Sequence, residues 1–117
     1  MARIYKIEIY RYTINNTIMS NPASRLSKLC YDANVILCHN PNSIHQSFKI
    51  FDTIVQILNT EYSIIPREDA FNTGTYIYDM FQSASPTLQA SISKQDYYML
   101  ELYVTFILGV VSLYTNK

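Results

Sequence analysis

The sequence contains no tryptophan, two glycines and two cysteines among its 117 residues. Two-residue hairpin turns need glycine or asparagine at positive φ, so this shortage of glycine favours helices over a hairpin-rich sheet. It also excludes the usual glycine-rich loops that hold phosphates, and the sequence has no Walker A, dinucleotide-binding or HExxH zinc motif. We therefore expect a non-enzymatic helical protein without a cofactor.

Charge is scarce as well. Charged residues make up 15% of the chain, where about 25% is usual, and nine basic residues balance nine acidic ones to a net charge of zero. The basic residues are scattered, whereas binding to phosphates needs clustered lysine and arginine. We expect no nucleic-acid partner. A surface with so little net charge favours self-association, so we expect a homo-oligomer.

The N-terminal stretch MARIYKIEIYRY lacks the continuous apolar segment and the small-residue cleavage site of a signal peptide. We therefore expect an intracellular, cytoplasmic protein whose two cysteines are reduced. Isoleucine, asparagine, tyrosine and lysine supply 40 of the 117 residues. All four have AT-rich codons, and this composition is typical of a small viral, phage or mobile-element protein.

The length indicates a single domain over residues 1–117. Apolar residues recur at helical spacing over residues 22–38 and 44–62, and a third helix is predicted from Pro66 until SASP ends it at Pro86. A short helical turn with Leu88 and Ile92 and a last helix from Lys94 to Tyr114 complete the fold. We expect an all-α protein, a compact bundle of four to five helices around a hydrophobic C-terminal helix.

Residues 3–14 fit two structures. Alternation of Tyr5, Ile7 and Ile9 with charged residues favours a strand, which would make the fold α+β. Helical spacing of apolar residues fits the same segment. A lone strand would pair with a second copy or with a partner protein.

Local signals place several helix ends. Asn21 and Pro22 suit the start of the first helix, Asn42 or Ser43 the start of the second, and Ser93-x-x-Asp96 is a capping box for the last. Gly74 lies on the apolar face of the third helix. It indicates either a close approach of another helix or a merely tolerated glycine.

No charged side chain occurs from Leu102 to Asn116, in the closing stretch YYMLELYVTFILGVVSLYTNK. On a helical wheel, one side carries Leu100, Tyr103, Ile107, Val110, Val111 and Tyr114. Another apolar side carries Met99, Leu102, Phe106 and Leu113. A helix that is apolar nearly all round lies in a core or in lipid. We expect a core helix; the alternatives are a core helix that lends a face to a dimer or partner, and a membrane span, which Glu101 disfavours.

The chain also holds four thiol and imidazole side chains, in the spacing C-x7-C-H-x5-H: Cys30, Cys38, His39 and His45. Structural zinc sites usually show close ligand pairs such as C-x2-C, which are missing here. We interpret these residues as core thiols and surface imidazoles, with no metal. Cys38 and His39 are adjacent in sequence, but neighbouring side chains at a helix end diverge and do not form a nucleophile–base pair.

Tyrosine is abundant, with eleven residues. A tyrosine buries its ring while its hydroxyl stays wet, and tyrosine is enriched at protein interfaces. Packing at the rim of an ordinary core is the alternative. The predicted partner-binding residues are those of the second half of the chain: Tyr76, Tyr78, Tyr97, Tyr98, Tyr103 and Tyr114.

The segments REDAFNTGTYIYDMF and YYMLELYVTFILGVV carry the apolar pattern of two amphipathic helices. In that pattern they are similar to the later helices of the poxviral Bcl-2-like proteins, although the Asn-Trp-Gly-Arg motif of the cellular relatives is absent. The resemblance implies a groove for an amphipathic helix, or a dimer face, in an inhibitor of apoptosis or innate signalling.

The residues themselves predict a protein–protein interaction module that binds and modulates a host protein and self-associates. An immunity or accessory subunit of a larger complex, and a small membrane-associated subunit anchored by its C-terminal helix, are further alternatives.

Overall fold

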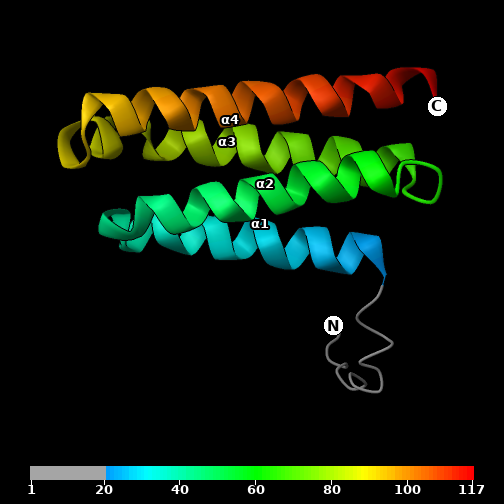
Figure 1. Ribbon diagram of the computed structural model, residues 1–117, viewed down its shortest axis with the longest axis horizontal. Helices are drawn as coiled ribbons and strands as arrows, with labels where there is room; N and C mark the ends of the chain where they lie inside the picture. Colours follow the sequence, from blue (N-terminus) through cyan, green and yellow to red (C-terminus); the bar gives the residue numbers. More distant parts are fainter. Residues whose placement is uncertain (1–20) are drawn as a thin grey trace, which may run out of the picture.

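The computed structural model describes residues 21–117. Within them the fold is an all-α bundle of four helices, without a strand, as the sequence predicted (Figure 1). The elements are α1 (Pro22–His39), the 3-10 turn η2 (Pro41–Ser43), α2 (Ile44–Thr60), α3 (Arg67–Ser91), α4 (Lys94–Ser112) and the 3-10 turn η3 (Leu113–Asn116). The strand or helix predicted for residues 3–14 lies outside the described residues.

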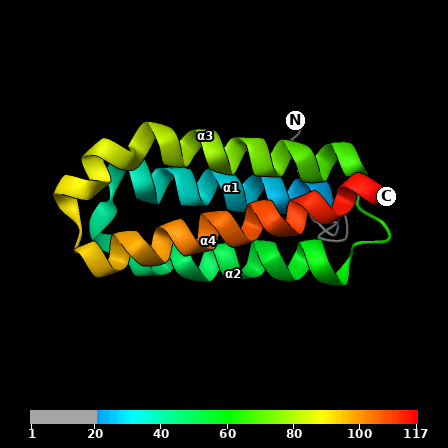
Figure 2. The ribbon, with the colours of Figure 1, turned by 90° about the horizontal axis from the view of Figure 1, so that it is seen from above.

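The four helices run antiparallel from one to the next and form a square. Helix α1 packs against α2 and α3, and α4 packs against the same two helices, so α1 and α4 occupy opposite corners. Figure 2 looks onto α4, with α2 and α3 on either side and α1 behind. The hydrophobic C-terminal helix is therefore one corner of the bundle and not an enclosed axis.

Two predicted helix starts are confirmed by their hydrogen bonds. Asn21 Oδ1 accepts a bond of 2.8 Å from the Ala23 amide at the start of α1. Ser93 Oγ accepts one of 3.0 Å from the Asp96 amide at the start of α4. These bonds satisfy amides that have no partner within their own helix.

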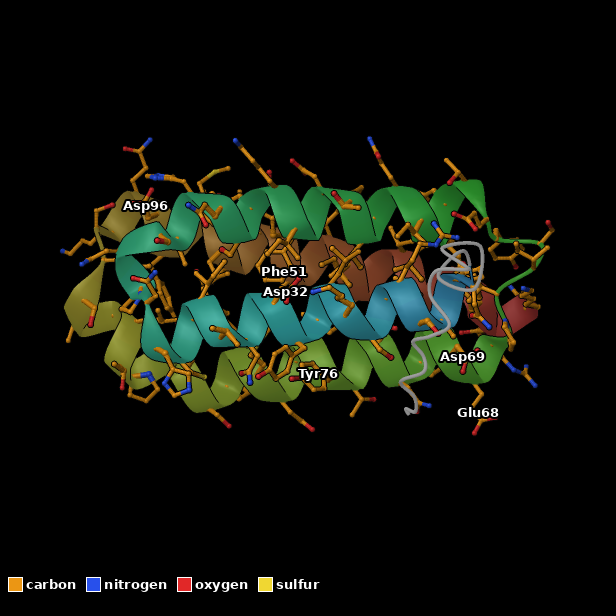
Figure 3. All side chains as sticks on the ribbon, turned by 90° about the horizontal axis from the view of Figure 1, so that it is seen from below. Asp32, Phe51, Glu68, Asp69, Tyr76 and Asp96 are labelled. Carbon is orange, nitrogen blue, oxygen red and sulfur yellow. The ribbon has the colours of Figure 1, made fainter. Side chains whose placement is uncertain are left out.

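One apolar stripe from each helix meets in the centre of the bundle. Phe51 points from α2 into this space (Figure 3), where its side chain is fully buried. The other large side chains in the core include Leu26, Leu37, Ile54, Leu58, Ile77, Leu88, Leu100 and Ile107. Gly74 of α3 is buried too, and a Cβ there would lie 3.2 Å from Val111 Cγ1 of α4. The glycine thus permits the close approach of α3 and α4.

The predicted end of the third helix at Pro86 is wrong, because α3 continues to Ser91 with Pro86 inside it. Proline removes one backbone hydrogen bond and costs about 3 kcal/mol in a helix interior. Here the ring is exposed, and Leu88 beyond it is fully buried. Burial of the apolar face past the proline therefore outweighs the local preference. Figure 2 shows this end of α3, in yellow, turning towards α4.

The C-terminal turn η3 is tied to the loop between α2 and α3. The Lys117 ammonium donates to the carbonyls of Tyr62 and Ile65, and the Tyr62 hydroxyl donates to the Leu113 carbonyl at 3.3 Å. The rings of Tyr62 and Tyr114 pack with centroids 4.6 Å apart. These contacts hold the C-terminal turn, including Leu113, against the loop between α2 and α3.

Candidate functional site on the outer side of the C-terminal helix

The six tyrosines predicted to bind a partner do not share one surface. Tyr114 lies in the core, where its hydroxyl donates a bond of 2.5 Å to the Leu58 carbonyl. Burial, and secondarily the neighbouring Tyr62, raises the pKa of this phenol. A fully buried side chain offers a partner no contact area on the folded chain.

Two more of these tyrosines are half-buried between helices. Tyr103 stacks on Phe48 of α2 with ring centroids 5.2 Å apart. Burial, followed by the hydrogen bond to Asp52, raises its pKa. Tyr97 packs on Phe81 of α3, with centroids 5.7 Å apart, and its hydroxyl bonds to that of Ser85. Both residues join α4 to its neighbours. They therefore fit the alternative interpretation of these tyrosines, which is packing at the rim of an ordinary core.

Tyr76 is exposed on the side of the bundle away from α4 (Figure 3). It lines a hollow of about 300 Å³ between α1 and α3, together with Tyr31 and Cys30. Burial is the largest cause that raises the pKa of Tyr76. Burial also raises the pKa of the Cys30 thiol to about 12, so this thiol stays protonated and inert at neutral pH.

Tyr78 of α3 and Tyr98 of α4 are the two remaining tyrosines, and both are exposed. Tyr98 belongs to a row of large exposed side chains on the side of α4 that faces away from the bundle. Their exposed fractions run from 36% to 59%, and they are Tyr98, Met99, Leu102, Phe106 and Leu113. At 100° per residue they fall within an arc of about 100°. We call this row, with Gly109 among it, the outer face.

The sequence identified Met99, Leu102, Phe106 and Leu113 as one apolar side of the helix, but not as the exposed one. The relative width of the two apolar sides of this helix could have indicated which one is exposed. The stripe from Leu100 to Tyr114 holds six apolar residues and is the side that the core takes, since an amphipathic helix buries its broader face. The narrower side is left outside.

Gly109 lies within the outer face, and its lack of a side chain has no explanation inside the chain. A Cβ built there would meet no atom within 4 Å, in contrast to the crowded Gly74. Glycine inside a helix costs about 0.5–1 kcal/mol relative to alanine. The absence of a side chain at Gly109 leaves the backbone of α4 open to close approach from outside.

A shallow hollow of about 280 Å³ lies at the junction of α3 and α4. Its lining residues are Phe71, Gly74, Thr75, Tyr78, Leu108 and Val111. Phe71 and Tyr78 are themselves exposed. No charged side chain lines this hollow. At 100° per residue, the exposed residues Glu101, Thr105 and Ser112 lie between it and the outer face, so the two are separate surfaces.

The continuous helix Lys94–Asn116 is the one stretch among the described residues that is long and apolar enough to cross a membrane. A third of its most apolar window is buried inside the bundle. A core helix of a soluble protein meets the same two criteria, so length and hydropathy alone do not distinguish the alternatives.

Of the two cysteines that we interpreted as core thiols, only one lies in the core. Cys30 is buried, whereas Cys38 is exposed and bonds to Asn34 Oδ1 at 3.2 Å. His45 pairs instead with Asp96 of α4, with Nε2 and Oδ1 3.0 Å apart. In residues 21–117 no three His, Cys, Asp or Glu side chains gather in a group that could hold a metal ion.

A larger hollow, of about 620 Å³, lies between α1 and α2. Charged and polar side chains make up most of its lining, and Arg25 and Glu61 pair at one end. The guanidinium donates two bonds to the carboxylate, Nη1 to Oε2 at 2.8 Å and Nη2 to Oε1 at 2.5 Å. This pair holds the pKa of Glu61 below its usual value. The guanidinium and the carboxylate at this end therefore satisfy each other.

Comparison with known proteins returned no relatives: no protein-family model matches the chain, and neither curated proteins nor solved structures gave a match.

Proposed function

We propose that this protein is a non-enzymatic interaction module that binds another protein through the outer face of α4. The observation that supports this proposal is the row of five exposed large apolar side chains on one side of α4. A monomer seldom leaves so large a contiguous apolar surface in water. Phenylalanine, methionine and tyrosine are also the residues in which protein interfaces are enriched.

The composition supports a small viral, phage or mobile-element protein, and we propose that it modulates a host factor inside the cell. An immunity or accessory subunit, or a Bcl-2-like inhibitor, would use a protein-binding face in the same way. A membrane-associated subunit would instead place the outer face in lipid. Solubility separates the last case from the others, because only a membrane-associated subunit requires detergent to be soluble and monodisperse.

The test compares the proteins cross-linked to three forms in the cells that produce them: wild type, Phe106→Lys and Tyr31→Lys. Phe106 lies in the outer face, and Tyr31 is an equally exposed aromatic residue on α1 at the opposite corner. We expect wild type and Tyr31→Lys to yield the same cross-linked proteins and Phe106→Lys to lose them. Circular dichroism confirms that all three fold. An identical set of partners for the three forms would refute the proposal.

A further inference from the structure

Four residues of the outer face, Leu102, Phe106, Gly109 and Leu113, are spaced symmetrically along the helix. Leu102 and Phe106 are separated by three residues, Phe106 and Gly109 by two, and Gly109 and Leu113 again by three. The spacing reads the same from either end. A second helix laid antiparallel on the first would therefore place Leu102 against Leu113 of the second copy, and Phe106 against Gly109.

This pairing matches sizes as well as positions. Phe106 is 57% exposed and stands clear of the bundle, whereas the space above Gly109 holds no atom within 4 Å of a Cβ position. The large ring of one copy can thus lie over the glycine of the other, twice in one contact. A two-fold axis requires such self-complementarity of a single patch.

Charge and area agree with this arrangement. No charged side chain lies between Leu102 and Asn116, so a charged partner finds no opposite charge there. Two antiparallel helices also place opposite ends of their dipoles side by side. The five exposed side chains present on the order of 500 Å² of apolar surface, at the upper end for a monomer. Two copies that covered all of this surface would bury about 1,000 Å², the level at which specific interfaces begin.

We infer that the outer face is covered by a second copy of this chain, in an antiparallel α4–α4 pair with Phe106 over Gly109 and Leu102 beside Leu113. The inference rests on the proposed function, since it names the protein that the outer face binds. A host factor then contacts the pair on its remaining surface.

A mixing experiment tests the register. Leu102→Lys and Leu113→Glu each place a charge against an apolar side chain, and we expect each variant alone to raise the dimer dissociation constant roughly tenfold or more. An equimolar mixture brings the introduced lysine against the introduced glutamate at one contact, and leaves leucine against leucine at the other. Sedimentation equilibrium should show a dimer in the mixture and monomers of 13.6 kDa in either variant alone.

Three controls decide the interpretation. A mixture of Leu102→Lys with Leu102→Glu regains the dimer in a parallel pair and stays monomeric in the antiparallel one. Gly109→Leu introduces a side chain where the single chain has open space. It should therefore keep its helical spectrum while it loses the dimer. Tyr31→Lys should leave the dimer unchanged.

Three outcomes overturn the inference. A wild type that stays monomeric without detergent at every concentration refutes self-pairing, while the cross-linking comparison still judges the proposed function. A dimer that survives Leu102→Lys and Leu113→Glu uses another surface. A protein that is monodisperse only in detergent places the outer face in lipid and refutes both proposals.

Discussion

At the scale of single residues, Tyr114 joins the C-terminal turn to the second helix. Its hydroxyl donates to the Leu58 carbonyl in the last turn of α2, where helix carbonyls run short of backbone donors. We expect Tyr114→Phe to lower the free energy of unfolding by about 1 kcal/mol, because a buried carbonyl loses its partner. Urea denaturation measures this change. Tyr98→Phe, at an exposed hydroxyl, is the control and should leave the midpoint unchanged.

The same residue predicts how the stability of the fold changes at alkaline pH. Burial raises the pKa of Tyr114, so the folded chain holds the phenol proton more tightly than the unfolded chain does. The resulting stability is fully present below the unfolded pKa of about 10, and it is lost as the pH rises through the folded pKa. Tyr114→Phe should therefore lose less stability than wild type as the pH is raised from neutral through this range. Equal losses in the two proteins would contradict this account.

At the scale of elements, the last turn of α3 tests whether the segment beyond Pro86 belongs to the core. Leu88 is fully buried and Thr87 is exposed. We expect Leu88→Ala to cost about 2–4 kcal/mol through lost burial and the cavity left behind. Thr87→Ala should change stability by less than about 0.5 kcal/mol. Thermal unfolding of the two variants decides the matter; similar melting temperatures would mean that residues 87–91 form a separate surface turn.

The ion pair between Arg25 of α1 and Glu61 at the end of α2 predicts how the stability of the fold changes at acidic pH. Arg25 lowers the pKa of Glu61, so this contribution to stability is present above the unfolded pKa of about 4.3. It is lost as the pH falls through the folded pKa. At neutral pH, Glu61→Gln should cost about 0.5–1 kcal/mol, as is usual for a partly exposed pair. The difference from wild type should vanish once the pH lies below the folded pKa.

The matched control for this prediction is Asp32→Asn, which removes the more exposed pair of Asp32 with Lys28 in α1. We expect it to change the melting temperature less than Glu61→Gln does, because a solvated i,i+4 pair contributes little. An equal or larger effect of Asp32→Asn would show that the two bonds between Arg25 and Glu61 add no special stability.

These elements also show what the sequence could predict. Asn21 and Ser93 act through neighbours three or fewer residues away, so their capping bonds follow from local pattern. The continuation of α3 through Pro86 depends on burial of Leu88 by other helices, and no local rule contains that information. The tyrosines differ for the same reason: Tyr114 and Tyr98 carry the same side chain, and only the packing of the bundle buries one and exposes the other.

At the scale of the whole molecule, pairing through the outer face would make stability depend on protein concentration. If two folded copies pair and unfolded chains do not, mass action raises the melting temperature as protein concentration rises. We expect this rise in wild type and in Tyr31→Lys, and a constant melting temperature in Phe106→Lys. Differential scanning calorimetry over a wide range of protein concentration measures it. A wild-type melting temperature that stays constant over this range would contradict pairing in solution.

The diagonal placement of α1 and α4 has a consequence for anything bound elsewhere on the molecule. Two copies joined at α4 turn their α1 helices to opposite ends of the pair. Any target recognised by the α1 side would meet a bivalent particle, and a target that is itself oligomeric or repetitive would be held at two points at once. The strength of bivalent binding would then depend on the spacing of sites in the target. A variant that no longer pairs would lose this gain in affinity, even though no residue that contacts the target has changed.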